Sequence, residues 1–167
     1  YVKLPYGLTA TRVYNVIEIM GKRKETEKIC LPIDTDRLPE NLLAGEWKFS
    51  FKKFLYDGNT DKIPRKMYTK WFDYDKMKKG FEIRTRKAGD YIIVDDEGHH
   101  KKLKQVFTGD KIPAQQRAGL WLIAHESLVH AIIGYRSGCG ALVTPQTGKV
   151  LKITFYGGKQ NGFFKKI

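Results

Sequence analysis

Two clusters of basic side chains offer the clearest chemistry in this sequence. One lies in the segment FEIRTRKAGD at positions 81–90, and the other lies in HHKKLKQVF at positions 99–107. Lysine and arginine bind phosphate groups through charge-assisted hydrogen bonds, so the two clusters predict an anion-binding surface. The candidate binding residues in these clusters are Arg84, Arg86, Lys87, Lys101, Lys102 and Lys104.

A short strand and a helix must position these side chains. Arg84 and Arg86 stand two residues apart on the expected strand, so they share one face and form a candidate phosphate clamp. A Gly-Asp turn follows, in which we expect Asp90 to cap its own turn. The helix is predicted over residues 101–108, where the apolar residues recur at helical spacing. Its lysines then face the solvent, and a plain solvated face is the alternative interpretation. The apolar face of this helix consists of Leu103, Val106 and Phe107.

The same segments resemble a known family. IRTRKAGDYI followed by KKLKQVFTGDKIP is similar to the C-terminal domain of tRNA(Ile)-lysidine synthetase, a PP-loop family, with its R-x-R-x-x-G-D turn, K-K-L-K-x-x-F helix and K-[IV]-P exit. WFDYDKM resembles the family's F-D-x-D-K-[LM] segment, and GYR at 134–136 resembles its G-[LY]-R. The resemblance thus implies that Arg136 joins the basic surface, and Lys111 is a further candidate binding residue. The resemblance covers roughly residues 71–153, and a weaker similarity to the family is found near the N-terminus in KLPYGLTATRVY. This chain departs from many relatives after the Gly-Asp turn, where it has Tyr91 in place of Arg.

The resemblance implies both a fold and a function. The family uses ATP to join lysine to the wobble cytidine of an isoleucine tRNA, and its catalytic domain is N-terminal. The C-terminal part holds the acceptor arm of the tRNA. The implied fold is α+β and mostly antiparallel, a small β-sandwich or barrel-like architecture with short helices, similar to a domain of the phenylalanyl-tRNA synthetase β chain. ATP, magnesium and the substrate lysine would belong to the parent protein, and we expect no cofactor in this chain.

Composition agrees with a nucleic-acid partner. The 167 residues are 41% hydrophobic, which is typical of a globular chain, and carry a formal charge of +13. Residues 78–167 hold 16 Lys or Arg against 7 Asp or Glu, so the second half is the more basic. A net charge of this size calls for a polyanionic partner. We find neither a membrane-spanning apolar run nor a signal peptide, and we expect a cytoplasmic protein with free thiols at Cys30 and Cys139. Because the sequence begins at Tyr1, we expect it to be a piece of a longer protein.

Strand patterns dominate the chain outside the basic segments. We predict strands at 11–19, 27–33, 46–56, 121–124, 128–133 and 150–156, a short helix or turn at 73–79, and a brief helix at 113–117. The predicted organisation is an N-terminal β-rich subdomain at 1–78, a lysidine-synthetase-type domain at 79–156 and a basic tail at 157–167. A row of lysines at positions 48, 52 and 53 allows contact with RNA, or else only a solubilising polar face.

Catalytic chemistry is absent from the pattern. There is no Walker-type loop and no Ser-Gly-Gly-x-Asp-Ser loop, so we expect the chain alone to be inactive, with no catalytic residues and no metal site. The acidic run Asp95-Asp96-Glu97 is better explained as a turn than as a catalytic pair. The alternative function is a protein-interaction or dimerisation module, in which the aromatic stretch near Trp71 forms the interface, in a possible homodimer.

Overall fold

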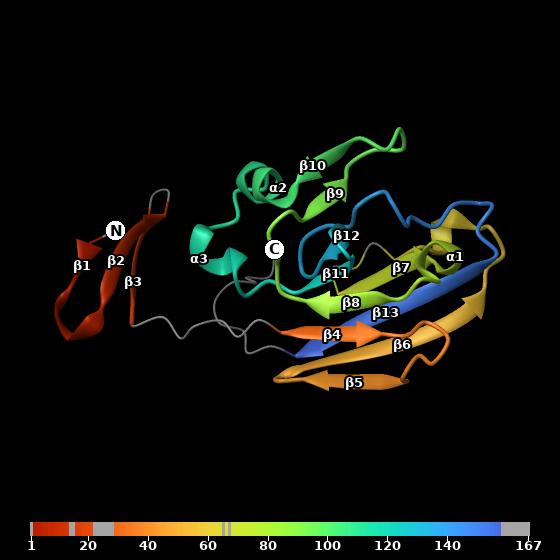
Figure 1. Ribbon diagram of the computed structural model, residues 1–167, viewed down its shortest axis with the longest axis horizontal. Helices are drawn as coiled ribbons and strands as arrows, with labels where there is room; N and C mark the ends of the chain where they lie inside the picture. Colours follow the sequence, from red (N-terminus) through yellow and green to blue (C-terminus); the bar gives the residue numbers. More distant parts are fainter. Residues whose placement is uncertain (1, 14–15, 22–28, 65, 67, 158–167) are drawn as a thin grey trace.

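The computed structural model describes residues 2–13, 16–21, 29–64, 66 and 68–157 (Figure 1). These residues form three β-sheets and a few short helices. The predicted α+β fold class with mostly antiparallel strands is confirmed. None of the described helices has the length and apolar character needed to span a bilayer. The predicted tail lies outside the described residues, apart from its first position.

The N-terminal sheet contains three antiparallel strands in the order β1-β2-β3, drawn in red in Figure 1. They are β1 (Val2–Lys3), β2 (Thr9–Val13) and β3 (Val16–Met20). The prediction of one strand over 11–19 is therefore wrong, because β2 and β3 pair with each other inside that range. β-Branched residues predict extended backbone but do not show where the chain reverses.

The central sheet contains six strands in the order β10-β9-β12-β11-β8-β4. Its strands are β4 (Cys30–Ile33), β8 (Phe81–Arg84), β9 (Tyr91–Ile93), β10 (His100–Lys102), β11 (Leu122–His125) and β12 (Leu128–Ile132). The predicted hairpin of β11 and β12 is confirmed, and only the pairing of β12 with β9 is parallel among the described strand pairs. β-Strand composition thus predicted most members of this sheet but not their order.

The outer sheet contains four antiparallel strands in the order β5-β6-β13-β7. They are β5 (Asn41–Ala44), β6 (Trp47–Leu55), β7 (Thr69–Asp73) and β13 (Lys149–Gly157). The predicted strands at 46–56 and 150–156 are confirmed as β6 and β13. The outer and central sheets each join strands from both sides of residue 78, and the predicted division of the chain there stays a prediction.

The helices are short and sit at the ends of strands. They are α1 (Tyr74–Met77), α2 (Leu103–Gly109) and α3 (Ala114–Arg117), with 3₁₀ turns at Pro5–Gly7 and Thr60–Lys62. Asp73 caps α1 by accepting a hydrogen bond from the backbone N–H of Asp75. Of the helix or turn predicted at 73–79, the helix is found as α1, and the brief helix predicted at 113–117 is confirmed as α3.

Two apolar cores separate three layers. The first core lies between the outer and central sheets and contains Phe49, Phe155 and Ile83. The second lies on the other face of the central sheet, where Leu103, Val106 and Phe107 of α2 pack against residues of β11 and β12. Figure 1 shows α2 and α3 on the side of the central sheet that faces away from the outer sheet. The buried face predicted for α2 is confirmed.

Candidate nucleic-acid interface

Arg84 ends strand β8 inside the protein. Its side chain has no exposed surface, and its guanidinium makes a bidentate pair with the Asp90 carboxylate at 2.9 and 2.8 Å. It also donates to Glu82 Oε2 at 2.8 Å and to the carbonyl oxygens of Thr85 and Glu126 at 3.0 and 2.6 Å. These bonds use all five guanidinium donors. Burial alone would lower the pKa of Arg84, but the hydrogen bonds and charges of Asp90 and Glu82 raise it.

The phosphate clamp predicted for Arg84 and Arg86 is therefore corrected. β8 ends at Arg84, so Arg86 lies in the turn rather than on the strand. Alternation along a strand shows which residues share a face but does not show whether that face meets a charged partner inside the fold. Arg84 holds the scaffold together, and of the two arginines only Arg86 is exposed.

Asp90 joins the turn to the helix that follows it. Its carboxylate accepts a hydrogen bond from the backbone N–H of Lys87 at 2.7 Å, so it caps the turn as predicted. Its carbonyl oxygen accepts one from the backbone N–H of Leu103 at 2.8 Å, at the start of α2. Gly89 has φ of +89°, a conformation that favours glycine at this point of the turn. The R-x-R-x-x-G-D segment thus fixes the distance between the turn and α2.

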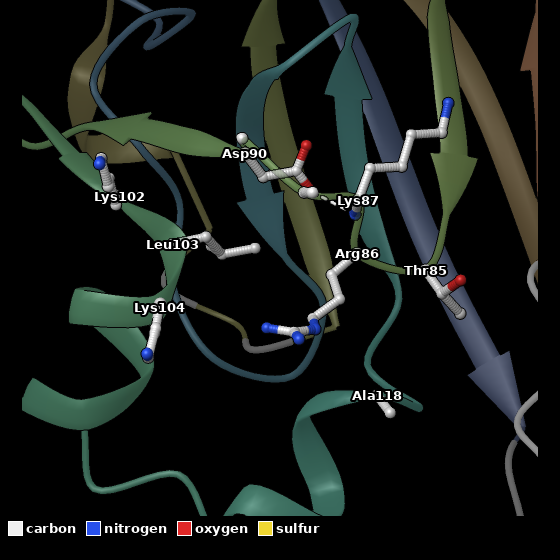
Figure 2. Close-up of a pocket in the computed structure, with 10 residues that line it drawn as sticks. Thr85, Arg86, Lys87, Asp90, Lys102, Leu103, Lys104 and Ala118 are labelled. Carbon is white, nitrogen blue, oxygen red and sulfur yellow. Dashed lines mark hydrogen bonds between the residues drawn. The ribbon is translucent and has the colours of Figure 1, made fainter.

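A cleft of about 600 Å³ lies between this turn and α2 (Figure 2). It is lined by Thr85, Arg86, Lys87, Ala88, Gly89, Asp90, Lys102, Leu103, Lys104 and Ala118. In Figure 2 the guanidinium of Arg86 extends into the space between α2 and α3, and Lys104 lies on the α2 side of that space. The two predicted basic clusters therefore meet at one cavity.

Three cations of the cleft have no counter-ion among the described residues. Within the described part of the chain, the side chains of Arg86, Lys102 and Lys104 form no ion pair or hydrogen bond, and all three residues are exposed. Lys87 differs, because its amine donates to Glu82 Oε2 at 2.8 Å and extends away from Arg86 in Figure 2. The hydrogen bond from Lys87 lowers the pKa of Glu82. The free positive charge of the cleft thus comes from the other three residues.

The second basic cluster is divided between a strand and a helix. Lys101 and Lys102 belong to β10, where they pair with Ile92 and Tyr91 of β9, and only Lys104 is helical. The prediction that all three lysines lie on one helix is wrong. Pairing with β9 holds the first two in extended backbone, and alternation then sends Lys101 and Lys102 to opposite faces.

The remaining predicted residues lie outside the cleft lining. Arg136 Nη1 is 3.6 Å from Asp110 Oδ1, and Lys111 is an exposed residue with φ of +54° directly after that aspartate. The acidic run at 95–97 forms a turn, in which Asp95 accepts hydrogen bonds from the backbone and ring of His99. That turn joins two strands, not a strand and a helix.

Two contributors were not predicted from the sequence. Glu82 forms ion pairs with both Arg84 and Lys87. The sequence did contain a signal for the first pair, because Glu82 stands two residues before Arg84 on one strand and their side chains therefore share a face. Ala118, which follows α3, lines the far side of the cleft. No local pattern could predict that wall, because α3 reaches it only through tertiary packing.

Comparisons with known proteins agree with the motifs and the fold. Residues 81–153 match the family model described as the TilS substrate C-terminal domain, and this range contains all eight predicted binding residues. A crystal structure of the TILS C-terminal domain superposes with a TM-score of 0.53, covering 77% of this chain and 90% of that one at 16% identity. Residues 81–153 are therefore similar to the TilS-type C-terminal domain, and the resemblance indicated by the motifs is confirmed.

Curated relatives extend the match to most of the chain. It is 30% identical over 155 residues to a tRNA(Ile)-lysidine synthase of Caldanaerobacter subterraneus subsp. tengcongensis, covering 92% of this chain and 32% of that protein. It is 32% identical over 154 residues to the tRNA(Ile)-lysidine synthase of Clostridium perfringens, covering 90% and 29%. The chain thus spans about a third of the length of these relatives and is similar to their C-terminal part.

Proposed function

We propose that this chain binds tRNA as the C-terminal portion of a tRNA(Ile)-lysidine synthetase, gripping the acceptor arm while another part of the longer protein attaches lysine to the wobble cytidine. The observation that carries the proposal is the cleft of Arg86, Lys102 and Lys104, three exposed cations with no counter-ion in the described residues. We expect it to act in the cytoplasm on an isoleucine tRNA.

The physical basis is phosphate recognition on a rigid scaffold. A double-stranded RNA arm presents phosphates and 2′-hydroxyls over a shallow minor groove, and proteins grip it mostly by shape and charge. The turn that carries Arg86 is anchored by Arg84 and Asp90, and α2 is anchored by its buried apolar face. Cations on such fixed elements lose little freedom on binding. The cleft therefore suits phosphate contacts that position the RNA.

The cleft does not suit ATP chemistry. Asp90 is its single carboxylate among the lining residues, and both of its oxygens already accept hydrogen bonds from Arg84 and Lys87. Magnesium prefers free oxygen ligands, so these residues do not fit the metal of an ATP complex. In this proposal ATP, magnesium and lysine bind to a part of the longer protein other than this cleft.

The rival function, a protein-interaction or dimerisation module, loses most of its expected surface. Phe72 and Tyr74 of the aromatic stretch are buried in the first core, and Trp71 packs edge-on against Phe54 at 5.0 Å. Aromatic residues packed in this way stabilise the fold and leave less of their surface to a partner.

Charge reversal at the cleft tests the proposal. In the double variant Lys102→Glu and Lys104→Glu, fluorescence anisotropy should show tRNA affinity lowered at least about tenfold, with a shallower salt dependence. The variant Arg86→Ala should lower the affinity by a smaller factor. A matched control reverses Lys76 and Lys79, two exposed lysines outside the cleft, and should change the affinity little. Unchanged affinity in both cleft variants would remove tRNA binding from this site.

A further inference from the structure

One face of the outer sheet lies outside both apolar cores formed by the described residues. Phe49 and Phe51 of β6 and Ile153 and Phe155 of β13 point into the first core. Since successive side chains of a strand alternate, the residues between them point away from the central sheet. The outward-facing residues include Lys48, Ser50 and Lys52 on β6, Lys152, Thr154 and Tyr156 on β13, Thr69 and Trp71 on β7, and Asn41 and Leu43 on β5.

Lys48, Lys52 and Lys152 lie near one another on this face, and no acidic side chain of the described residues pairs with them. Lys52 lies directly opposite Lys152 on the neighbouring strand, and Lys48 precedes Lys52 by two outward positions. Like charges directly opposite each other destabilise a sheet. Among the described residues none of the three forms an ion pair or side-chain hydrogen bond. The face therefore keeps a concentrated positive charge at a cost to the fold, which suits a polyanionic partner.

The acidic residue on the outward face of these strands does not neutralise the three lysines. Asp73 is the one acidic residue among the outward positions of these four described strands. It is 8% exposed and accepts hydrogen bonds from Thr147 Oγ1 at 2.7 Å and from the backbone N–H of Asp75 at 3.0 Å. Both oxygens of the Asp73 carboxylate are thus occupied by hydrogen bonds, one from Thr147 in the loop before β13 and one from the start of α1.

Aromatic and hydroxyl groups lie between the lysines. Tyr156 is 53% exposed and pairs directly with Lys48, and Ser50, Thr154 and Thr69 form the next row across the sheet. An exposed aromatic ring beside cations can stack an unpaired base, while hydroxyl groups can bond to bases and 2′-hydroxyls. The bases of an RNA duplex are already stacked on each other and cannot use such a ring. The composition of this face therefore favours single-stranded RNA over a duplex.

We propose that this outward face of the outer sheet is a second RNA-binding surface, which holds an unpaired segment of the RNA through Lys48, Lys52, Lys152 and Tyr156. The inference rests on the proposed function in that the partner is tRNA. It concerns a different part of the molecule, because the cleft adjoins α2 on the opposite side of the central sheet (Figure 1). Lys48 and Lys52 stand about 13 Å apart along β6, so two or more nucleotides are needed to contact both.

Two RNA probes and two sets of variants separate the surfaces. Fluorescence anisotropy at fixed low salt would compare an unstructured 12-nucleotide RNA with a 12-base-pair RNA duplex. Lys52→Glu and Tyr156→Ala should each weaken binding of the single strand about fivefold or more and change duplex binding less than twofold. The cleft variant Lys102→Glu with Lys104→Glu should do the reverse. Lys76→Glu, with the same charge change as Lys52→Glu, should alter neither affinity more than twofold.

Unfolding measurements exclude a trivial loss of structure. Lys52→Glu replaces a like-charge pair with a Glu–Lys pair across the strands, so its melting temperature should equal or exceed that of the original protein even as RNA affinity falls. Single-strand affinity unchanged in both sheet variants, or equally reduced by Lys76→Glu, would overturn the second surface and leave the cleft standing. Failure of the original protein to bind either RNA would overturn both proposals.

Discussion

At the scale of single residues, Arg84 shows how a binding motif can be a structural one. In the sequence, its residue type, its spacing from Arg86 and its basic neighbours all indicate phosphate binding. In the structure, every donor of its guanidinium bonds to another group of the protein. What the sequence could not show was that Asp90, six positions later, returns to the same place. The turn between them brings the two side chains together, and the exposed Arg86 is the residue left for a ligand.

Arg84→Ala should destabilise the protein by about 3–5 kcal/mol, because it leaves the buried Asp90 carboxylate without its partner. Urea denaturation would measure the loss of unfolding free energy. Arg86→Ala, two positions away and exposed, is the matched control and should change the stability by less than about 0.5 kcal/mol. Equal and small effects of the two substitutions would contradict the structural role of Arg84.

His130 should make stability depend on pH. It lies in a bulge of β12, opposite no residue of β11, and is 4% exposed. Burial, and next the charge of His125, lower the pKa of His130 to about 4. The unfolded chain binds this proton near pH 6.5, so the folded state is fully favoured above that value and loses stability as the pH falls toward 4.

The loss due to His130 should be about 2 kcal/mol between pH 7 and pH 5 and about 3 kcal/mol by pH 4. Guanidinium denaturation at these pH values would measure it, with His130→Phe as the comparison, since that side chain cannot take up a proton. The difference between the two proteins isolates His130 from the carboxylates that titrate in the same range. Parallel pH profiles would show that His130 does not control this dependence.

At the scale of elements, the apolar spacing of α2 predicted its buried face correctly but not its first residue. Helical periodicity is a local property, so Leu103, Val106 and Phe107 were identified from the sequence alone. Lys101 and Lys102 are extended because β9 pairs with them, and a partner strand leaves no local signal in the lysines themselves. Likewise the strands β6 and β13 were predictable, whereas their adjacency was not.

Phe107→Ala should remove about 3–5 kcal/mol of stability, because it opens a cavity in the second core. The ring is fully buried and lies 5.9 Å from the Arg117 guanidinium of α3. Thermal and chemical denaturation would record the change. Gln105→Ala on the exposed side of α2 should stay within about 0.5 kcal/mol, and a similar loss there would argue against the assigned buried face.

At the scale of the whole molecule, the cations behind the charge of +13 divide into those that form ion pairs inside the fold and those that stay exposed without one among the described residues. Arg84, Lys87 and Arg136 form ion pairs, whereas Lys102 and Lys104 of the cleft and the lysines of the outer sheet form none within the described residues. The candidate cleft was predictable as two basic clusters, but which members remain available was decided by the folded positions of Glu82, Asp90 and Asp110.

Binding of tRNA should weaken steeply with salt, because each neutralised phosphate releases counterions. With roughly four to six phosphate contacts, the affinity should fall about a hundredfold or more between low and near-physiological salt. A titration of the dissociation constant against potassium chloride would give the slope, with heparin of matched charge as the competitor. A flat slope, or affinity no higher than that for heparin, would favour an interaction module with a merely solubilising surface.

The central place of β13 in the outer sheet has a consequence for synthesis. β6 and β7 leave the ribosome early, yet the strand that both must pair with is made only at residues 149–157. Until then their edges lack hydrogen-bond partners, and Phe49, Phe51 and Phe72 lack the side chains of β13 that cover them. Such nascent strands are prone to wrong pairing. The growing polypeptide should therefore depend on chaperones until β13 has been made.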